Sequence, residues 1–270
     1  MITASVVTYR TDSAELERCL GALQRSSVAT VYVIDNASEQ RVKDIAAGFS
    51  KAEYTANINS GYGAAHNIAL RKAIGTGALY HLVLNTDVDF EPDAVELTAA
   101  YLERNADTGM VQPRIVGADG ALLHSCRLLP TPFDLIIRRF LPDRLFVSRR
   151  KEYLLEHLDY SAEHNIPYHQ GSFMTLRLKA VEQCGGFDER FFMYPEDIDL
   201  TRRIHRNWRT MYMPDASVTH FHRAGSYHSF RLLAVHVVNI CRYFNKWGWW
   251  SDKERTRFNA PLRAKKNGAR

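Results

Sequence analysis

The first part of the chain alternates short apolar runs with segments of helical periodicity. A period of two is typical of strands and a period near 3.6 is typical of helices, so the two kinds of segment can be told apart. Strands are predicted at residues 2–8, 30–34, 54–56 and 79–84, and helices at residues 12–24, 40–49, 64–74 and 92–105. Strands that alternate with helices predict an α/β fold with a mostly parallel sheet covered on both faces.

The second part of the chain is less regular. Strands are predicted at residues 109–116, 171–178, 210–213 and 216–220, helices at 179–184 and 197–206, and an irregular or helical insertion at 117–168. A long helix is predicted at 230–247, with Leu233, Val237, Ile240 and Phe244 on one side. Because neither a repeat nor a linker interrupts the pattern, we expect one domain over residues 1–250 and a basic tail at 251–270.

Composition narrows the class of protein. The chain has 270 residues, 46% of them hydrophobic and 24% charged, which is enough for one large α/β domain or two small ones. Its apolar runs stay below the roughly 18 residues of a membrane-spanning helix, and its start lacks the features of a signal peptide. The 4 cysteines are scattered without a CxxC pair, which favours reduced thiols. These features predict a cytoplasmic protein.

Basic charge is unevenly distributed, although the net charge is only +5. Arginines and Lys151 are interleaved with apolar residues at 133–151, and three tryptophans precede further basic residues at 247–266. This mixture suits the surface of an anionic membrane. A solvated face over ordinary core contacts explains it equally well. A nucleic-acid partner is not expected, because the sequence has no motif of a known nucleic-acid-binding module.

Polar and acidic residues follow several predicted strands, where α/β proteins bind ligands. Asp35 ends the second strand and could accept from a ribose or a base, or cap the next helix. The small-residue loop that includes Asn59, Gly61 and Gly63 opens a helix. It could admit a phosphate or simply form a tight turn, and it matches neither a Walker loop nor GxGxxG.

Asn85, Asp87 and Asp89 lie directly after the fourth predicted strand. Carboxylate and amide oxygens suit Mg²⁺ or Mn²⁺, ions that commonly bind a diphosphate at the same time. Turn and cap duty is the alternative for so short a motif. An imidazole from His220 or His222 could complete the site.

Three carboxylates, Glu196, Asp197 and Asp199, fall within four residues behind an aromatic approach. Like charges this close repel each other, so the cluster needs a metal, a proton or cationic partners. Two acidic sites on one chain indicate a metal-held anionic substrate and a proton acceptor.

Together these motifs resemble the inverting family 2 glycosyltransferases of the GT-A fold, above all their bacterial rhamnosyltransferase branch. The block from Gly185-Gly186-Phe187-Asp188-Glu189 to Glu196-Asp197-x-Asp199-Leu200 is the most specific match. The others are Val6-Val7-Thr8-Tyr9, Val33-Ile34-Asp35-Asn36-Ala37-Ser38, Asn59-x-Gly61-x-Gly63 with Asn67, Leu84-Asn85-Thr86-Asp87, Gly171-Ser172-Phe173-Met174, and His220 with Gly225-Ser226. Three positions depart from the family: Arg10 stands where Asn is common, Thr86 where Pro is usual, and Thr201 where Cys is frequent.

The resemblance implies a role for each matching residue. Asp197 would be the general base with Glu196 beside it, and Asp87, Asp89 and His220 would hold Mg²⁺ or Mn²⁺. The half spanning about residues 1–115 would bind the nucleotide sugar, through Thr8, Tyr9, Arg10, Asp35, Asn36, Asn59, Gly61, Gly63, Asn67, Asn85 and Thr86. The half spanning about 116–250 would bind the acceptor, through Gly171, Ser172, Arg242, Tyr243 and Lys246. The last three are candidates for the acceptor's diphosphate, and a solvated or core-edge role explains them equally well.

The resemblance also implies a reaction and its partners. The donor would be dTDP-β-L-rhamnose and the acceptor a sugar on a polyprenyl diphosphate, as in O-antigen synthesis at the cytoplasmic face of the inner membrane. Another donor, such as a UDP-hexose or UDP-galactofuranose, and a non-catalytic sugar-nucleotide-binding role stay open, as does assembly into a homodimer. Every one of these readings requires Asp87 and Asp197 to lie in one cleft.

Overall fold

The computed structural model describes residues 1–135, 146–221 and 230–263. Its centre is a 9-stranded sheet in the order β3-β2-β1-β4-β10-β6-β11-β5, with β8 paired to β11. The first four strands are parallel neighbours in that sheet, and they are β1 (Ile2–Thr8), β2 (Thr30–Asp35), β3 (Ala52–Ala56) and β4 (Tyr80–Leu84). The alternating pattern of the first part of the chain therefore predicted this region correctly.

The other half of the sheet is mixed in direction. Here β10 (Phe173–Arg177) runs antiparallel between β4 and β6 (Thr108–Val116), which in turn pairs in parallel with β11 (Arg209–His220). The short strands β5 (Val88–Phe90) and β8 (His164–Asn165) are antiparallel to β11. A separate two-stranded sheet joins β7 (Cys126–Arg127) to β9 (Tyr168–His169). β11 is one strand with an irregular register between Met213 and Ser217, where the sequence predicted two strands.

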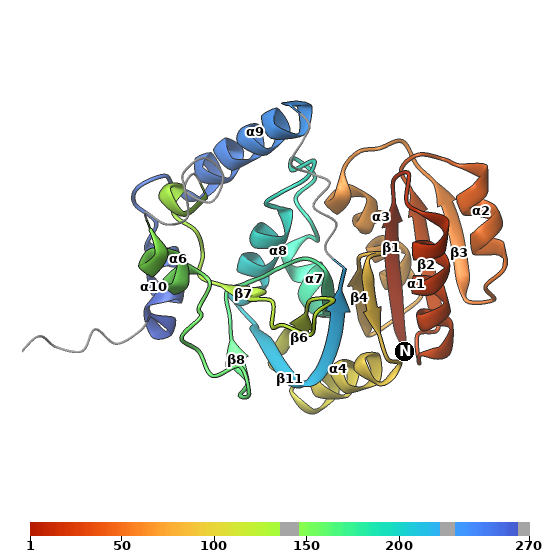
Figure 1. The fold of residues 1–270 in the computed structure, drawn as a ribbon, viewed down its shortest axis with the longest axis horizontal. Helices are drawn as coiled ribbons and strands as arrows, with labels where there is room; N and C mark the ends of the chain where they lie inside the picture. Colours follow the sequence, from red (N-terminus) through yellow and green to blue (C-terminus); the bar gives the residue numbers. More distant parts are fainter. Residues whose placement is uncertain (136–145, 222–229, 264–270) are drawn as a thin grey trace, which may run out of the picture.

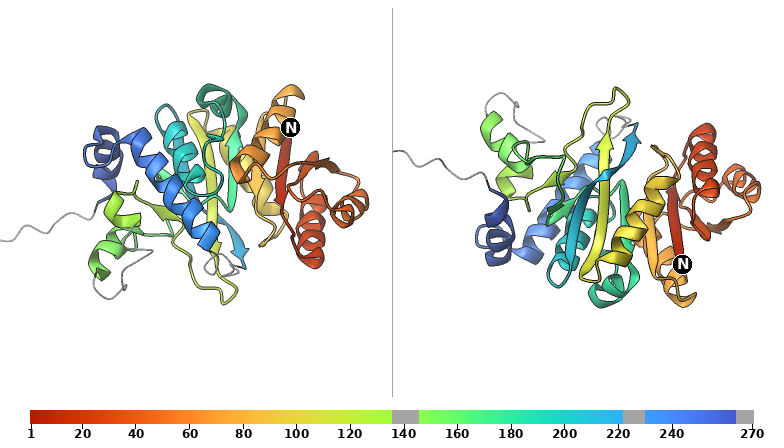
Figure 2. Two further views of the ribbon diagram at one scale, coloured as in Figure 1. Left: turned by 90° about the horizontal axis from the view of Figure 1, so that it is seen from above. Right: turned by 90° about the horizontal axis from the view of Figure 1, so that it is seen from below.

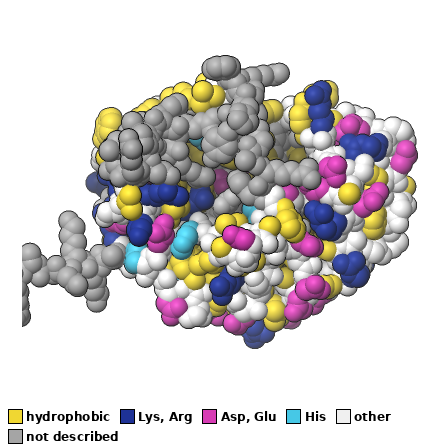
Figure 3. Space-filling view, viewed as in Figure 1, with side chains coloured by type: hydrophobic (Ala, Val, Ile, Leu, Met, Phe, Trp, Pro, Cys, Tyr) yellow, Lys and Arg dark blue, Asp and Glu magenta, His cyan; other side chains and the backbone are white. Residues whose placement is uncertain are grey.

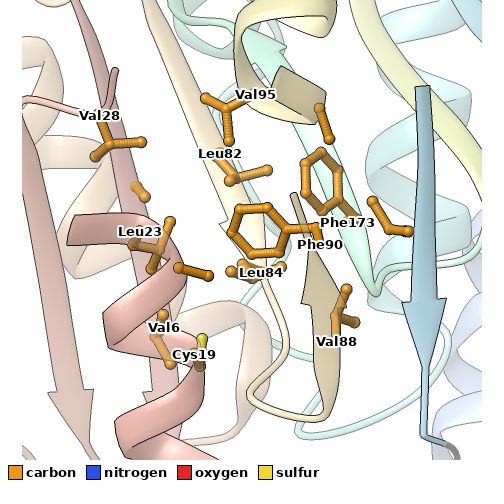
Figure 4. Close-up of a cluster of buried hydrophobic side chains, with 14 of the residues drawn as sticks. Val6, Cys19, Leu23, Val28, Leu82, Leu84, Val88, Phe90, Val95 and Phe173 are labelled. Carbon is orange, nitrogen blue, oxygen red and sulfur yellow. The ribbon is translucent and has the colours of Figure 1, made fainter. Parts of the chain in front are cut away.

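Helices cover both faces of the sheet, as predicted. On one face α1 (Ser13–Arg25), α2 (Gln40–Ala47) and α4 (Asp93–Arg104) bury Leu23 and Val95 against the sheet, and Phe90 and Phe173 meet edge to face between them (Figure 4). On the other face α3 (Tyr62–Gly75), α7 (Leu178–Cys184) and α8 (Glu196–His205) bury a second cluster.

A third apolar cluster lies beyond the sheet and includes residues of the C-terminal helices. It joins α6 (Val147–Tyr153), α9 (Phe230–Trp247) and α10 (Lys253–Asn259), which is followed by a 3₁₀ turn at Ala260–Leu262. α9 lies above α8 in Figure 1 and passes in front of it in the left view of Figure 2. The predicted α/β fold with a C-terminal helical extension is confirmed.

The buried side of α9 agrees with the predicted one at Ile240 and Phe244 and differs at Val237, which is 39% exposed. Asn239 and Tyr243 are buried as well. The side-chain amide of Asn239 donates to the carbonyl oxygen of Met193 at 2.9 Å, which satisfies this polar group in the interior.

α10 anchors the C-terminal extension to α8. The guanidinium of Arg202, 1% exposed, donates two hydrogen bonds of 2.7 Å to Asp252 and one of 2.8 Å to Glu254. It also lies 4.0 Å from the ring centroid of Trp247. Residues 252–262, expected as part of a basic tail, therefore belong to the packed structure.

Some predicted features cannot be placed. Residues 136–145 of the basic segment 133–151 lie outside the described residues, as do His222, Arg223, Gly225 and Ser226. Within the described ranges, none of the helices combines the length and hydropathy needed to cross a bilayer. Acidic and basic side chains are interspersed over the described part of the face shown in Figure 3.

Candidate active site

Tyr62 links the two acidic motifs. Its hydroxyl, at the start of α3, lies 2.8 Å from the side-chain oxygen of Asn85 and 2.8 Å from the carbonyl oxygen of Gly171. The N–H of Gly171 then donates to Oδ2 of Asp197 at 3.1 Å. Burial, followed by the charges of Glu196, Asp197 and Asp87, raises the pKa of Tyr62 well above its usual value. Both motifs, more than a hundred residues apart, therefore face one hydroxyl.

The segment at residues 171–172 lies between these motifs. A Cβ at Gly171 would lie 3.0 Å from Cβ of Asp197, so glycine allows the backbone N–H to reach the carboxylate. The carbonyl oxygen of Ser172 accepts from the N–H of Asn85 at 3.0 Å, and its buried hydroxyl has no hydrogen-bond partner among the described residues. Both residues, expected at the acceptor site, thus line the junction.

Glu196 and Asp197 begin α8, where a helix N-terminus favours negative charge. Glu196 is nonetheless only 5% exposed, and its Oε2 has no partner among the described side chains. Burial and then the charge of Asp197 raise the pKa of Glu196 to about 8. Burial and the neighbouring charge therefore favour the protonated form of Glu196 within the acidic pair.

Asp199 is fully buried and its hydrogen-bond partners lie outside this junction. Its carboxylate accepts from Lys246 Nζ at 2.6 Å, from Arg203 Nε at 2.7 Å and from Trp247 Nε1 at 2.9 Å. The third carboxylate of the cluster is therefore stabilised by cations and joins α8 to α9.

Asp87, in the second acidic motif, pairs with His220. Nε2 of His220, at the end of β11, lies 3.2 Å from Oδ1 of Asp87, and the N–H of Phe221 donates to the carbonyl oxygen of Asp87 at 2.8 Å. The pairing of β5 with β11 sets this approach, since Val88 is opposite His220. Among the described residues, no group of three or more His, Cys, Asp or Glu side chains could hold a metal ion. The structure therefore does not bring Asp89 to this pair.

The pair fits a divalent ion only with help from a substrate. Mg²⁺ commonly takes one or two carboxylates from the protein and its other ligands from phosphate and water, and Mn²⁺ accepts the same oxygens together with imidazole. One carboxylate and one imidazole at the strand ends, with His220 4% exposed, match that donor set. Asp87 and His220 are thus the residues that could hold the ion.

Helix α1 supports both residues of this pair from behind. Glu15, 7% exposed, accepts a short hydrogen bond from the hydroxyl of Thr86, the neighbour of Asp87. One turn later the guanidinium of Arg18 lies 5.2 Å from the ring centroid of Phe221, the neighbour of His220. Thr86 stands where the family usually has proline, and its hydroxyl supplies a contact that proline lacks.

Asp35 is the most completely bonded of the predicted nucleotide-binding residues. It is fully buried and accepts from the hydroxyl of Thr8 at 3.1 Å, the hydroxyl of Tyr54 at 3.2 Å, and the N–H groups of Ala37 and Glu39 at 3.0 and 2.6 Å. Asp35 is not the N-cap of α2, which is Glu39, but it organises the turn that leads into that helix by accepting from the N–H of Glu39.

An amide network borders the same strand ends. Asn36 donates to the side chain of Asn59 at 3.3 Å and accepts from Asn57 at 2.7 Å. Gly61 has φ of 105°, and a Cβ there would lie 2.3 Å from the carbonyl oxygen of Phe192. This glycine therefore permits the loop to pack against the segment that leads into α8.

Four further predicted residues have different surroundings. Tyr9 is 52% exposed and Arg10, also exposed, lies over its ring, so both are open to solvent. Gly63 lies against Phe187, since a Cβ there would come within 2.9 Å of it. Asn67 hydrogen-bonds the backbone N–H and carbonyl of Phe187 at 2.8 and 2.9 Å. Asn67 therefore holds the 187–189 turn in place rather than facing a ligand.

The residues predicted on α9 to meet an acceptor diphosphate are not grouped on one open surface. Tyr243 is fully buried, and Lys246 is engaged with Asp188 at 2.7 Å and with Asp199. Arg242 is exposed and donates to the carbonyl oxygen of Arg190 at 2.8 Å. These contacts agree with the core-edge alternative for Tyr243 and Lys246, and an acceptor-binding role for the three residues stays a prediction.

Tyr62 is the site residue that sequence reasoning missed. Tyr62 lies between Gly61 and Gly63. The sequence predicted a role for the glycines and the asparagine of this motif but none for its tyrosine. A tyrosine at the first position of a helix that follows a strand end was the available signal, but its partners lie 23 and 109 positions away.

Known proteins with similar sequences bear on this geometry. The sequence model described as "Glycosyl transferase family 2" matches residues 3–185. The N-acetylglucosaminyl-diphospho-decaprenol L-rhamnosyltransferase of Mycobacterium tuberculosis is 30% identical over 190 residues, covering 67% of this chain and 58% of that protein. The chain thus spans less than two thirds of that relative. Rhamnosyltransferase WbbL of Escherichia coli K12 is 27% identical over 225 residues, covering 79% of this chain and 81% of its own length.

A solved structure with the same fold is that of GalNAc-T7 with UDP, GalNAc and Mn²⁺. It superposes with a TM-score of 0.66 at 14% identity, covering 96% of this chain and 49% of that one. At this identity the comparison supports a shared fold only. That shared fold covers nearly the whole chain.

Proposed function

The chain belongs to glycosyl transferase family 2, and on that premise we propose that it transfers a sugar from a nucleoside diphosphate to an acceptor hydroxyl with inversion. The observation that carries the proposal is the Tyr62 hydroxyl, which joins Asn85 to Gly171 and, through Gly171, to Asp197. A leaving group held near Asp87 and a base at Asp197 would then act on the same sugar. The half spanning about 1–115 would bind the donor, and the half spanning about 116–250 the acceptor.

Asp197 is the base in this proposal. An acceptor hydroxyl is too weakly acidic to attack unaided, so a carboxylate takes its proton during the attack. The N–H of Gly171 fixes Oδ2 of Asp197, and the hydroxyl of Thr201 fixes its backbone carbonyl at 2.8 Å. Glu196 keeps its own proton at neutral pH and so leaves the accepting role to Asp197.

Asp87 and His220 are the residues that would hold a divalent ion against the donor diphosphate. When bound, such an ion supplies positive charge that stabilises the diphosphate as it leaves. Thr86 and Asn85 keep the loop that carries Asp87 in place, through Glu15 and Tyr62 respectively. The amide network of Asn36 and Asn59 would border the nucleotide.

We further propose dTDP-β-L-rhamnose as the donor and a sugar on a polyprenyl diphosphate as the acceptor. This is supported by the names of the two relatives, one an L-rhamnosyltransferase for a diphospho-decaprenol-linked sugar and the other a rhamnosyltransferase. An enzyme with such an acceptor would work at the cytoplasmic face of the inner membrane. The exposed Trp250, 85% exposed after α9, is suited to the interface of a membrane.

The test is a panel of nucleotide sugars with Mg²⁺ or Mn²⁺ and an acceptor that carries a lipid diphosphate. We expect transfer from dTDP-β-L-rhamnose to form an α-linked product. Transfer from a UDP-hexose or UDP-galactofuranose alone would retain the enzyme class and replace the donor. Tight binding of a nucleotide sugar with neither transfer nor hydrolysis would instead indicate a binding protein and end the proposal.

A further inference from the structure

Arg127 is a buried cation that the mechanism above does not use. It lies on β7 and is 7% exposed. Its guanidinium donates to the hydroxyl of Tyr168 at 3.1 Å and to the side-chain oxygen of Gln170 at 3.2 Å, and in the described part of the chain its Nε has no hydrogen-bond partner. Neither the tyrosine hydroxyl nor the glutamine oxygen carries a charge. A buried charge is costly without an opposite charge nearby, so the surroundings should supply one.

The backbone leads from Arg127 directly to the acidic pair. Gln170, which accepts from Arg127, immediately precedes Gly171, and the N–H of Gly171 donates to Asp197 at 3.1 Å. The pairing of β7 with β9 fixes this arrangement, since Arg127 is opposite Tyr168 and the N–H of Gln170 donates to the carbonyl oxygen of Ser125 at 3.1 Å. Burial alone would lower the pKa of Arg127, but Tyr168, Tyr153 and Asp197 outweigh it and raise that pKa.

Most other titratable groups around this place are neutral at pH 7. Glu196 holds a proton, Tyr62 titrates well above its usual range, and burial lowers the pKa of His124. Among the described residues, the titratable groups that interact with Asp197, Arg127 or their immediate neighbours include Tyr62, Asp87, His124, Cys126, Tyr153, Glu156, Tyr160, Tyr168 and Glu196. Asp87 acts on this group through Tyr62 and has His220 beside it, which leaves Asp197 as the carboxylate that balances Arg127.

We propose that Arg127 is a positioning residue for charge: it keeps Asp197 ionised while Glu196 retains the proton. The inference rests on the proposed function, because only an ionised Asp197 can accept a proton from the acceptor hydroxyl. Without Arg127, the adjacent carboxyl groups of Glu196 and Asp197 would compete for one proton without the positive charge that Arg127 directs at Asp197. Arg127 thus selects which of the two acids is the base.

The first test is the pH dependence of transfer. In Arg127→Gln we expect the acidic limb of the kcat/KM profile to move up by about one pH unit, since loss of a nearby opposite charge raises a carboxyl pKa by 1–3 units. Arg127→Lys, which keeps the charge, should restore the limb of the wild type. Arg177→Gln is the matched control, because Arg177 is a half-buried arginine that donates to the carbonyl oxygens of Thr108 and Asn105, away from the acidic pair. A limb that does not move in Arg127→Gln would overturn the inference.

The second test needs no turnover. Infrared titration of the protonated-carboxyl band should show an additional group in Arg127→Gln, with a midpoint about one pH unit above that of the wild type. The additional change should vanish in Arg127→Gln/Asp197→Asn and persist in Arg127→Gln/Glu196→Gln. If the wild type transfers no sugar but the band shifts as described, the proposed function fails and the role of Arg127 stands. If sugar is transferred and the band does not shift, the reverse holds.

Discussion

The two sides of α8 use carboxylates in opposite ways. Asp199 is buried with three donors from Lys246, Arg203 and Trp247. Glu196, also buried, has an oxygen with no partner among the described residues, and Asp197 beside it is partly exposed. The same acidic segment thus provides an anchor on one side and a reactive pair on the other. The difference lies in the cations, which come from α9 and from α8 itself on the anchor side.

This contrast shows why the helix can hold a strained pair of acids. A shared proton and repulsion between neighbours destabilise the folded state, and the ion pairs on the opposite side offset that cost. Chemistry and stability are therefore separated on one helix. They should be separable by mutation.

The largest effect is expected from Asp197→Asn on the reactive side. The amide still accepts from Gly171 but cannot take a proton, so transfer should fall by about 10²-fold or more. Donor affinity and the melting temperature should stay close to those of the wild type, as measured by calorimetry. Transfer at the wild-type rate would show that another group is the base.

The next largest effect is expected from Asp199→Asn on the anchor side. Removal of this charge leaves Lys246 and Arg203 without their buried partner, and should lower the free energy of unfolding by about 2–3 kcal/mol. Urea unfolding measures this loss. Transfer per folded molecule should remain near that of the wild type. If Asp199→Asn instead abolished transfer at unchanged stability, the division between the two sides would be wrong.

A smaller effect is expected at the strand ends, where Asp87→Ala removes the carboxylate beside His220. Affinity for dTDP in the presence of Mn²⁺ should fall about tenfold or more, because the loss of one anionic ligand weakens the ion's hold on the diphosphate. Asp89→Ala is the matched control and should leave that affinity unchanged. Equal losses in both variants on calorimetry would restore Asp89 to the metal site.

The last prediction concerns the proton on Glu196, whose effect is a change of stability with pH. Its pKa is raised to about 8 in the folded state, against an ordinary value near 4.3 in the unfolded chain. Between these values the folded state binds more protons, so the contribution of Glu196 to stability falls as pH rises, by on the order of 1 kcal/mol per pH unit. Glu196→Gln should lack this contribution. Its stability relative to the wild type should therefore increase from pH 5 to pH 8 in chemical unfolding; a constant difference would contradict the buried proton.

Much of the fold was predictable because the necessary signals are local. Alternation within a strand and spacing within a helix can be read over a few residues, and the ends of β1, β2 and β4 fell close to where the sequence predicted them. The three-residue strand β5 was missed because it is too short to show a period. Helix α10 was missed because its basic composition is typical of a solvated tail, while the contacts that fix it come from Arg202.

The candidate site was predictable in its acids and not in their connections. Asp87 and Asp197 stand out as members of clusters, but Tyr62 and Arg127 acquire their roles from partners that only folding brings near. The core-edge contacts of Tyr243 and Lys246 likewise depend on partners that folding brings near. Periodicity predicts the buried side of α9 from its apolar residues alone. In the structure, hydrogen bonds made by Asn239, and others that reach Asp188 and Asp199, also help to determine which side of the helix is buried.

The bond between Arg202 and α10 has a consequence for synthesis on the ribosome. Asp252 and Glu254 are made about fifty residues after the arginine that they neutralise. Until they emerge from the exit tunnel, α8 carries a guanidinium that has no place in the interior. A nascent chain can therefore complete the strands β1 to β4 early, but it cannot set α8 until the segment that carries Asp252 and Glu254 has emerged.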